Sequence, residues 1–157
     1  MHTLLLFLIA AAILISYGYL KRHRPQRLTP LSELRLKARR PLTPFEERMF
    51  SALCTALPEC TVLAQVSFQA LLDTPRLEDR NRFNRKSADF VICSKNLTPI
   101  AVIELDDASH NSKRARDADR DAMLQNAGYQ TIRYNKIPTT AQVQLDIQTA
   151  LKNLTTN

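Results

Sequence analysis

Three carboxylates stand in or at the end of two apolar segments in the middle of the chain. Asp89 interrupts the segment 87–93, and Glu104 and Asp106 lie at the end of the segment 100–105. A buried carboxylate is costly unless a cation, a hydrogen-bond network or a metal lies beside it. Carboxylate oxygens are hard ligands that suit Mg²⁺ or Mn²⁺. The residues therefore indicate either a divalent-cation site formed by these acids or structural ion pairs without a metal.

The pairing of the two segments decides whether the acids converge. Side chains alternate along a strand, so Glu104 and Asp106 share one face, while the residues that alternate with them point into the core. If the segment 87–93 forms the neighbouring strand, Asp89 lies beside them, and crowded carboxylates raise one another's pKa unless a cation sits among them. In the alternative without a metal, Arg120 or Arg133 pairs with Asp89 and Glu104.

Sequence periodicity predicts the elements that position these acids. Thr43 as N-cap and Pro44 at the first helical position begin a helix with Glu46 in its first turn. Strands are expected at 61–68, 87–93, 100–105 and 129–134, and further helices at 113–127 and 140–154. The polar stretch 69–86 contains five basic residues and is expected to be an exposed loop or flap. This order predicts an α/β fold with a mixed sheet between helices.

The N-terminal residues form an apolar segment. Residues 3–20 carry no charge, and 18 residues in a helix cross most of a hydrocarbon layer of about 30 Å. A cleavable signal peptide needs a positively charged start and a small-x-small cleavage site, and neither is present. We therefore predict an uncleaved transmembrane anchor at residues 1–20.

The formal charge of +7 is concentrated in residues 21–40, which hold eight basic residues and one acidic residue. Residues 41–157 hold 14 basic and 14 acidic residues and are formally neutral. The positive-inside rule then predicts a single-pass membrane protein, with a basic juxtamembrane linker at 21–40 against anionic lipid heads and a cytoplasmic domain at 41–157. Three cysteines without C-x-x-C spacing predict packed thiols instead of disulfides or a zinc site.

Four stretches of sequence together resemble a known superfamily. They are LTPFEERMF, SADFVIC, IELDDASH and RDAMLQNAGYQTIRYNK, and they cover roughly residues 41–136. With the predicted element order, the chain resembles the PD-(D/E)XK nuclease-like superfamily, and within it the DUF2726 domain family and endonucleases of the very-short-patch-repair type. The resemblance implies a restriction-endonuclease-like core of helix, three strands, helix and strand with a final helix. It also implies a bacterial protein, whose anchor would lie in the inner membrane.

The resemblance also implies roles for single residues. Asp89 and Glu104 would hold a Mg²⁺ or Mn²⁺ ion, and strand alternation, not the resemblance, adds Asp106 as the third candidate ligand. Glu46 would be the carboxylate that the first helix supplies to the site. His110 would move a proton or steady the phosphate.

One position departs from the superfamily pattern, which usually has a lysine where this chain has Asp106. Lys86 or Lys113 would have to supply the missing cation. An active domain would hydrolyse phosphodiester bonds of nucleic acid, with DNA favoured over RNA as the substrate. The basic residues of 69–86 would bind the phosphates. The alternative is a catalytically inactive nuclease-like module that binds nucleic acid or a protein partner at the membrane.

Overall fold

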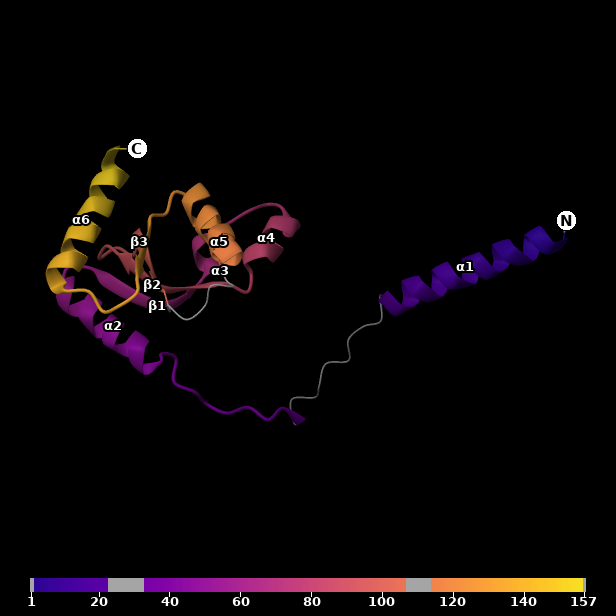
Figure 1. Ribbon diagram of the computed structural model, residues 1–157, viewed down its shortest axis with the longest axis horizontal. Helices are drawn as coiled ribbons and strands as arrows, with labels where there is room; N and C mark the ends of the chain where they lie inside the picture. The colour runs from indigo at the N-terminus through magenta and orange to yellow at the C-terminus, as the bar shows by residue number, and fades with distance from the viewer. Residues whose placement is uncertain (1, 23–32, 107–113, 157) are drawn as a thin grey trace. The chain divides into compact units, whose positions relative to one another are not determined.

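The computed structural model describes residues 2–22, 33–106 and 114–156 (Figure 1). Its helices are α1 (His2–Arg22), α2 (Pro44–Ala56), α3 (Phe68–Leu71), α4 (Leu77–Phe83), α5 (Arg114–Asn126) and α6 (Thr140–Thr156). Its strands are β1 (Thr61–Ser67), β2 (Ser87–Cys93), β3 (Pro99–Leu105) and β4 (Thr131–Tyr134). The chain divides into two compact units, Met1–Arg39 and Arg40–Asn157. All four strands belong to the second unit, a mixed α/β domain, as the sequence predicts.

The four strands form one sheet in the order β1-β2-β3-β4. The pairs β1–β2 and β2–β3 are antiparallel, whereas β3 and β4 are parallel and are joined by a crossover through α5. The mixed sheet and its crossover helix confirm the prediction, whereas the helices α3 and α4 between β1 and β2 were not predicted. The strands differ from the prediction only at their ends: β1 stops one residue early, β3 begins at Pro99, and β4 begins at Thr131 instead of residue 129.

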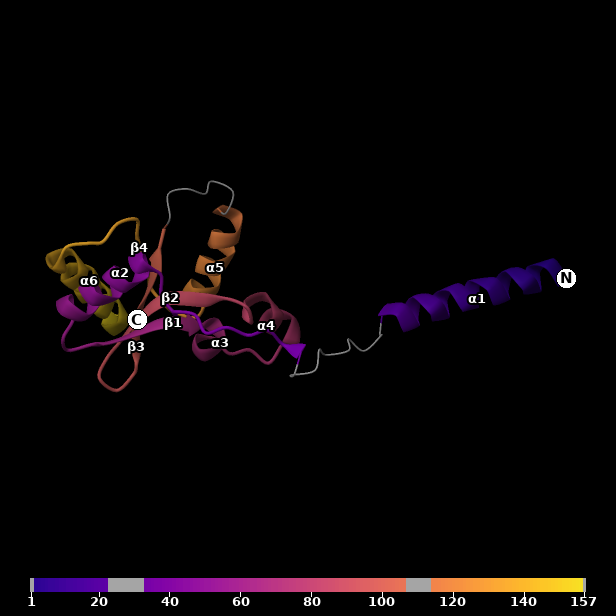
Figure 2. The same ribbon diagram turned by 90° about the horizontal axis from the view of Figure 1, so that it is seen from below.

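Helices cover both faces of the sheet, so the domain has a core on each face (Figure 2). The core under α2 and α6 includes Met49, Leu53, Phe90, Ile103 and Ile147. The core under α3, α4 and α5 includes Phe68, Phe83, Val91, Val102 and Leu124. Because β2 and β3 are central strands buried on both sides, they are almost continuously apolar, and a charged residue in them needs a partner.

The first turn of α2 is closed by a capping box. The Thr43 Oγ1 atom accepts a hydrogen bond from the Glu46 backbone N–H at 3.3 Å, and Glu46 Oε2 accepts one from the Thr43 N–H at 2.6 Å. These two bonds satisfy N–H groups that the helix itself leaves without partners. They confirm the predicted start of the helix and fix the position of the Glu46 carboxylate.

The prediction of an exposed loop over residues 69–86 is wrong in part. The stretch contains the end of α3 and all of α4. Phe83 in the last turn of α4 is buried and packs into the core under α5. One buried aromatic side chain attaches a short helix whose other residues are mostly polar, and composition alone does not reveal such an attachment.

The predicted transmembrane anchor is not supported. Helix α1 includes the apolar segment 3–20. Within the part of the chain that the structure describes, no helix is both long enough and apolar enough to span a bilayer. The single-pass membrane location that was predicted from this anchor is therefore unsupported as well. Of the predicted linker, residues 34–40 have no regular secondary structure.

The packing of α2 can be tested at two neighbouring positions. Leu53 is fully buried, whereas Cys54 is exposed on the same helix. We expect Leu53→Ala to lower the free energy of unfolding by about 2–5 kcal/mol, because it removes buried methyl groups and leaves a cavity. Cys54→Ala should change it by less than about 0.5 kcal/mol. Urea unfolding measures both values, and similar losses would show that α2 does not pack as described.

Candidate functional site

Four polar residues form a row across the sheet, one on each strand. Asp89 of β2 and Glu104 of β3 follow the last ladder pair between these strands, so they lie next to each other. Glu104 pairs with Arg133 of β4 on its other side. Gln65 of β1 falls opposite Asp89 in the register of β1 and β2. We call Gln65, Asp89, Glu104 and Arg133 the polar row.

The side chain of Asp89 lies where β2 and β3 separate. Its Oδ2 atom accepts a hydrogen bond from the Leu105 backbone N–H at 2.8 Å. Beyond this point β3 continues along β4, and the Asp106 N–H donates to the Tyr134 carbonyl at 3.0 Å. The carboxylate of Asp89 thus accepts the hydrogen bond that a backbone carbonyl of a neighbouring strand would otherwise accept from Leu105. This contact holds the carboxylate beside Glu104.

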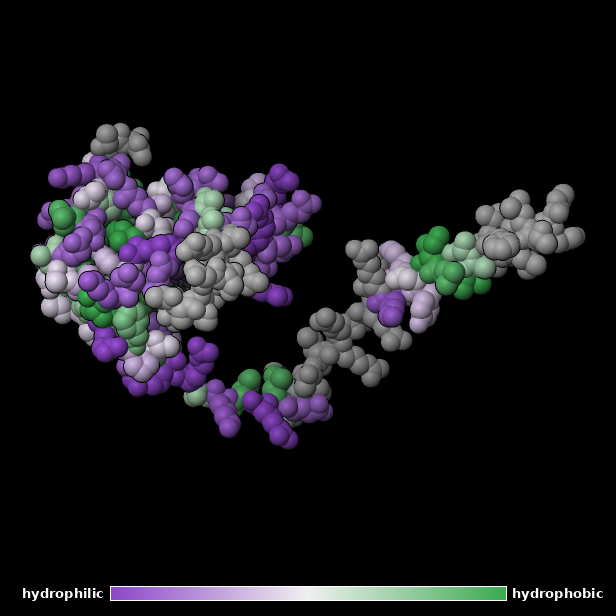
Figure 3. Space-filling view, viewed as in Figure 1, coloured by the Kyte–Doolittle hydropathy of each residue, from purple (hydrophilic) through white to green (hydrophobic). Residues whose placement is uncertain are grey.

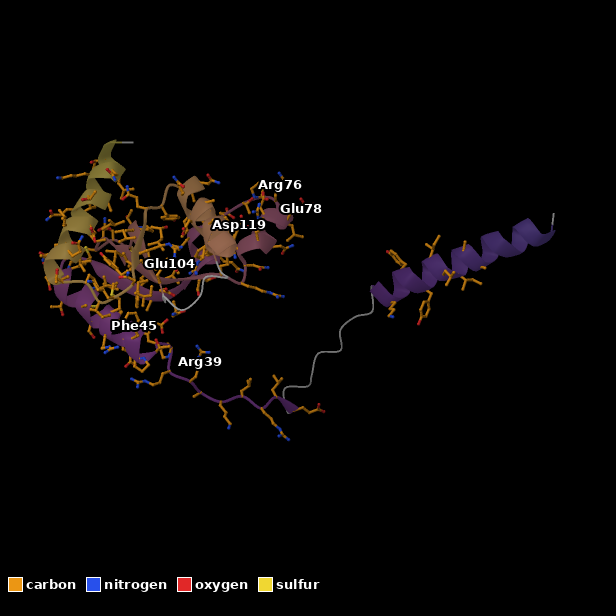
Figure 4. All side chains as sticks on the ribbon, viewed as in Figure 1. Arg39, Phe45, Arg76, Glu78, Glu104 and Asp119 are labelled. Carbon is orange, nitrogen blue, oxygen red and sulfur yellow. The ribbon has the colours of Figure 1, made fainter. Side chains whose placement is uncertain are left out.

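Glu104 forms a buried ion pair with Arg120 of α5. Glu104 is 3% exposed, and Arg120 Nη2 lies 2.7 Å from its Oε2 and 2.8 Å from its Oε1. Figure 4 labels Glu104 within the sheet. The same Nη2 also donates to the Ser87 carbonyl, and the guanidinium lies over the Phe68 ring, 5.5 Å from its centroid. Of the two arginines considered from the sequence, the structure assigns Arg120 to Glu104.

The second arginine, Arg133, joins two other acids. Its Nη1 lies 2.7 Å from Asp106 Oδ1, and its Nη2 lies 2.7 Å from Asp121 Oδ1 on α5. Asp106 therefore lies on the same face of the sheet as Glu104, as strand alternation predicts. Its partner is an arginine, however, so the carboxylate is engaged in holding Arg133.

Glu46 reaches the polar row through Gln65. Its Oε1 atom accepts a hydrogen bond from Gln65 Nε2 at 2.8 Å, while its Oε2 caps α2. Gln65 has a φ of 52°, in the left-handed region of backbone conformation that residues other than glycine rarely adopt. Such strained residues persist only where surrounding contacts hold them, and they cluster at functional sites. The hydrogen bond to Glu46 is one such contact.

The predicted metal ligands are only partly brought together. Asp89 lies beside Glu104, but Asp106 is bound to Arg133. His110 and Lys113 lie outside the described residues. Among residues 2–22, 33–106 and 114–156, no group of three or more His, Cys, Asp or Glu side chains is arranged to hold a metal ion. A site based on the two carboxylates of Asp89 and Glu104 remains a prediction.

Burial makes both acids of the polar row harder to ionise. It raises the pKa of Glu104 to about 8, although the charge of Arg120 acts in the opposite direction. Burial also raises the pKa of Asp89, against the Leu105 N–H and Arg120, and the charge of Glu46 adds to the rise. A cation bound between the two carboxylates would lower both pKa values. The raised pKa values therefore favour the binding of a cation next to Asp89 and Glu104.

Sequence reasoning identified the acids better than their partners. Gln65 was missed, since a single polar residue in an otherwise apolar strand has no specific signal. Its position opposite Asp89 could be inferred only after the register of β1 and β2 was known. Arg120 and Arg133 were named as possible partners, but their assignment depends on how α5 and β4 pack against β3.

The second unit is thus a mixed α/β domain with two adjacent acids and two arginines at one end of its sheet. The family model described as "Protein of unknown function (DUF2726)" matches residues 38–151. The chain belongs to the DUF2726 family, which confirms that part of the resemblance noted from the sequence. No curated protein and no solved structure matches the chain.

The raised pKa of Glu104 predicts a pH dependence of stability. In metal-free buffer, the free energy of unfolding should fall as pH rises from about 5 to about 8, because burial makes Glu104 harder to ionise in the folded chain than in the unfolded chain. Glu104→Gln mimics the protonated side chain, so its slope over this range should be shallower than that of the wild type. Urea unfolding at several pH values measures both slopes.

An exposed acid provides the matched control for this experiment. Glu59 is exposed and pairs loosely with Lys95 at 3.6 Å, so Glu59→Gln should keep the wild-type slope. A Glu104→Gln variant whose unfolding free energy depends on pH as strongly as that of the wild type would contradict the prediction.

Proposed function

We propose that the domain is a metal-dependent nuclease of the PD-(D/E)XK type, which hydrolyses phosphodiester bonds in nucleic acid. The observation that carries the proposal is the placement of Asp89 and Glu104 side by side where β2 and β3 separate. The second unit has the helix α2, the strands β1, β2 and β3, the helix α5 and the strand β4 in this order, with the short helices α3 and α4 between β1 and β2, and this arrangement around a mixed sheet supports the same superfamily.

The two acids fit a divalent ion in number and in donor type. Proteins often hold Mg²⁺ through one or two carboxylates, and water and substrate phosphate oxygens complete its coordination. Asp89 and Glu104 supply this number of carboxylates, and their raised pKa values favour an added cation. The bound ion would activate water and neutralise the charge that develops on the phosphate. Asp106 is reassigned in this proposal from metal ligand to holding Arg133.

Arg133 is the proposed source of the positive charge that the superfamily usually takes from a lysine. It lies beside Glu104 in the polar row, and Asp106 and Asp121 fix the orientation of its guanidinium. A preorganised cation stabilises a transition state because it needs no reorganisation during the reaction. Asp106, which occupies the lysine position of the superfamily pattern, thus brings an arginine to the site. His110 remains the candidate for proton transfer.

The substrate backbone would be held by basic residues in and just before α4. Arg76, Arg80 and Arg82 are exposed, and each forms ion pairs with exposed acids. Exposed ion pairs contribute only about 0–1 kcal/mol, so phosphates can replace the acids as partners. Hydrophilic residues gather over α4 and α5 in Figure 3, and Figure 4 labels Arg76 just before α4, Glu78 on α4 and Asp119 on α5.

A second candidate function is a catalytically inactive module that binds nucleic acid. Two observations favour it: Arg120 already neutralises Glu104, and the described residues contain no group of three metal-binding side chains. Such a module would use the same exposed basic residues of α4 and would need no divalent ion. The two candidates therefore differ in turnover and in metal dependence.

Nicking of a supercoiled plasmid by the full-length chain tests the proposed function. We expect nicking in Mn²⁺ or Mg²⁺ and none in EDTA. Asp89→Asn and Glu104→Gln should each lower the rate on the order of 100-fold or more, because each removes a charge that holds the ion. Glu59→Gln removes an exposed acid that pairs with Lys95 and should keep the wild-type rate.

The outcomes separate the two candidates. Nicking that survives in both Asp89→Asn and Glu104→Gln would contradict the proposed site. Plasmid binding without nicking in either metal would identify the inactive module.

A further inference from the structure

Arg120 is in direct contact with the carboxylate of Glu104. One nitrogen, Nη2, contacts both carboxylate oxygens, at 2.7 and 2.8 Å. Glu104 is 3% exposed, so water contributes little to its solvation and the guanidinium carries most of the compensation. An ion that binds Glu104 must therefore share the carboxylate with Arg120 or displace it.

The surroundings of Arg120 provide partners that do not depend on Glu104. Nη2 also donates to the Ser87 carbonyl, and the guanidinium lies over the Phe68 ring at 5.5 Å. Its Nε atom is buried and has no hydrogen-bond partner among the described residues. If the Arg120 guanidinium moved away from Glu104, it could keep its contacts with the Ser87 carbonyl and the Phe68 ring. Its Nε–H would also be available to a new acceptor.

The neighbouring arginine is held differently. In the described part of the chain, the ion pairs of Arg133 are with Asp106 and Asp121, both at 2.7 Å. Arg133 therefore acts on Glu104 only through its field, whereas Arg120 is in direct contact. This difference makes the two arginines a matched pair for an experiment.

We propose that Arg120 is the resident counter-ion of Glu104 and that it competes with a divalent metal ion for this carboxylate, which sets the metal affinity of the site. The inference rests on the proposed metal site at Asp89 and Glu104. Because coupling between two equilibria is reciprocal, a bound metal ion weakens the Glu104–Arg120 pair by the same factor by which Arg120 weakens metal binding. Arg120 is a positioning residue in this account, since it acts through Glu104.

Calorimetric titration of the full-length chain with Mn²⁺ tests the proposal. Arg120→Gln should bind Mn²⁺ at least about tenfold more tightly than the wild type, because loss of a charge-assisted hydrogen-bonded pair removes the competitor. Arg133→Gln should bind it only about two- to threefold more tightly, through the loss of one nearby charge. Lys95→Gln, in the β2–β3 loop, should bind it as the wild type does. Adding Glu104→Gln to Arg120→Gln should abolish the gain.

Thermal unfolding supplies a second measurement. Without metal, Arg120→Gln should melt below the wild type, because a buried acid loses its partner. With Mn²⁺ present, the rise in its melting temperature should exceed that of the wild type. If Arg120→Gln does not fold, Arg120→Lys keeps a cation but loses the planar guanidinium, and it should show a smaller gain in Mn²⁺ affinity.

The results distinguish this inference from the proposed function. If the wild type binds Mn²⁺ but Arg120→Gln binds it no more tightly than Arg133→Gln, or Arg120→Lys binds it no more tightly than the wild type, the competition is disproved and the metal site stands. If neither the wild type nor the Arg120 variants bind Mn²⁺, both proposals are overturned.

Discussion

A buried carboxylate in a strand that is covered on both faces is the constraint on which the polar architecture of the domain depends. Glu104 lies in β3 with helices packed above and below the sheet. Its cation has to come from another element, and α5 supplies it through Arg120. The described face of α5 contributes Leu124 to the core and Arg120 and Asp121 to ion pairs. The helix is therefore attached to the sheet by charge as well as by apolar contact.

The ion pairs and hydrogen bonds around Glu104 connect most elements of the domain. Arg133 of β4 ties the end of β3 to α5, and Gln65 of β1 ties the first turn of α2 to the sheet. Asp89 lies between these two sets of contacts. Buried ion pairs are weak sources of net stability, since desolvation offsets most of their attraction. Their effect is to fix where the side chains lie, which is also what a binding or catalytic site requires.

Features with a local signal could be predicted from the sequence. The Thr43–Glu46 capping box gave the start of α2, and the bounds of β2 were predicted to the residue. The acids at the end of β3 were identified because strand alternation is a property of a few neighbouring residues. Helix α4 was not predicted because its attachment to the domain depends on one buried residue, Phe83.

Features that depend on packing between distant elements could not be predicted. Arg120 meets Glu104 from 16 residues away, across the crossover, and Arg133 meets Asp106 from 27 residues away. Both arginines carry the same charge, so composition could not decide which acid each would take. The left-handed conformation of Gln65 likewise depends on contacts with α2 and β2. The apolar character of residues 3–20 was clear in the sequence, but no described helix is suited to crossing a membrane.

The parallel pairing of β3 and β4 has a consequence for the order of assembly during folding. The β2–β3 hairpin closes a loop of a few residues, whereas β4 can join β3 only after the chain has passed through α5. Short loops close at a lower entropic cost than long ones. By this measure the hairpin can form first and place the two acids side by side before α5 and β4 supply Arg120 and Arg133. Docking of the crossover would then be favoured by electrostatic attraction to these acids as well as by apolar contact.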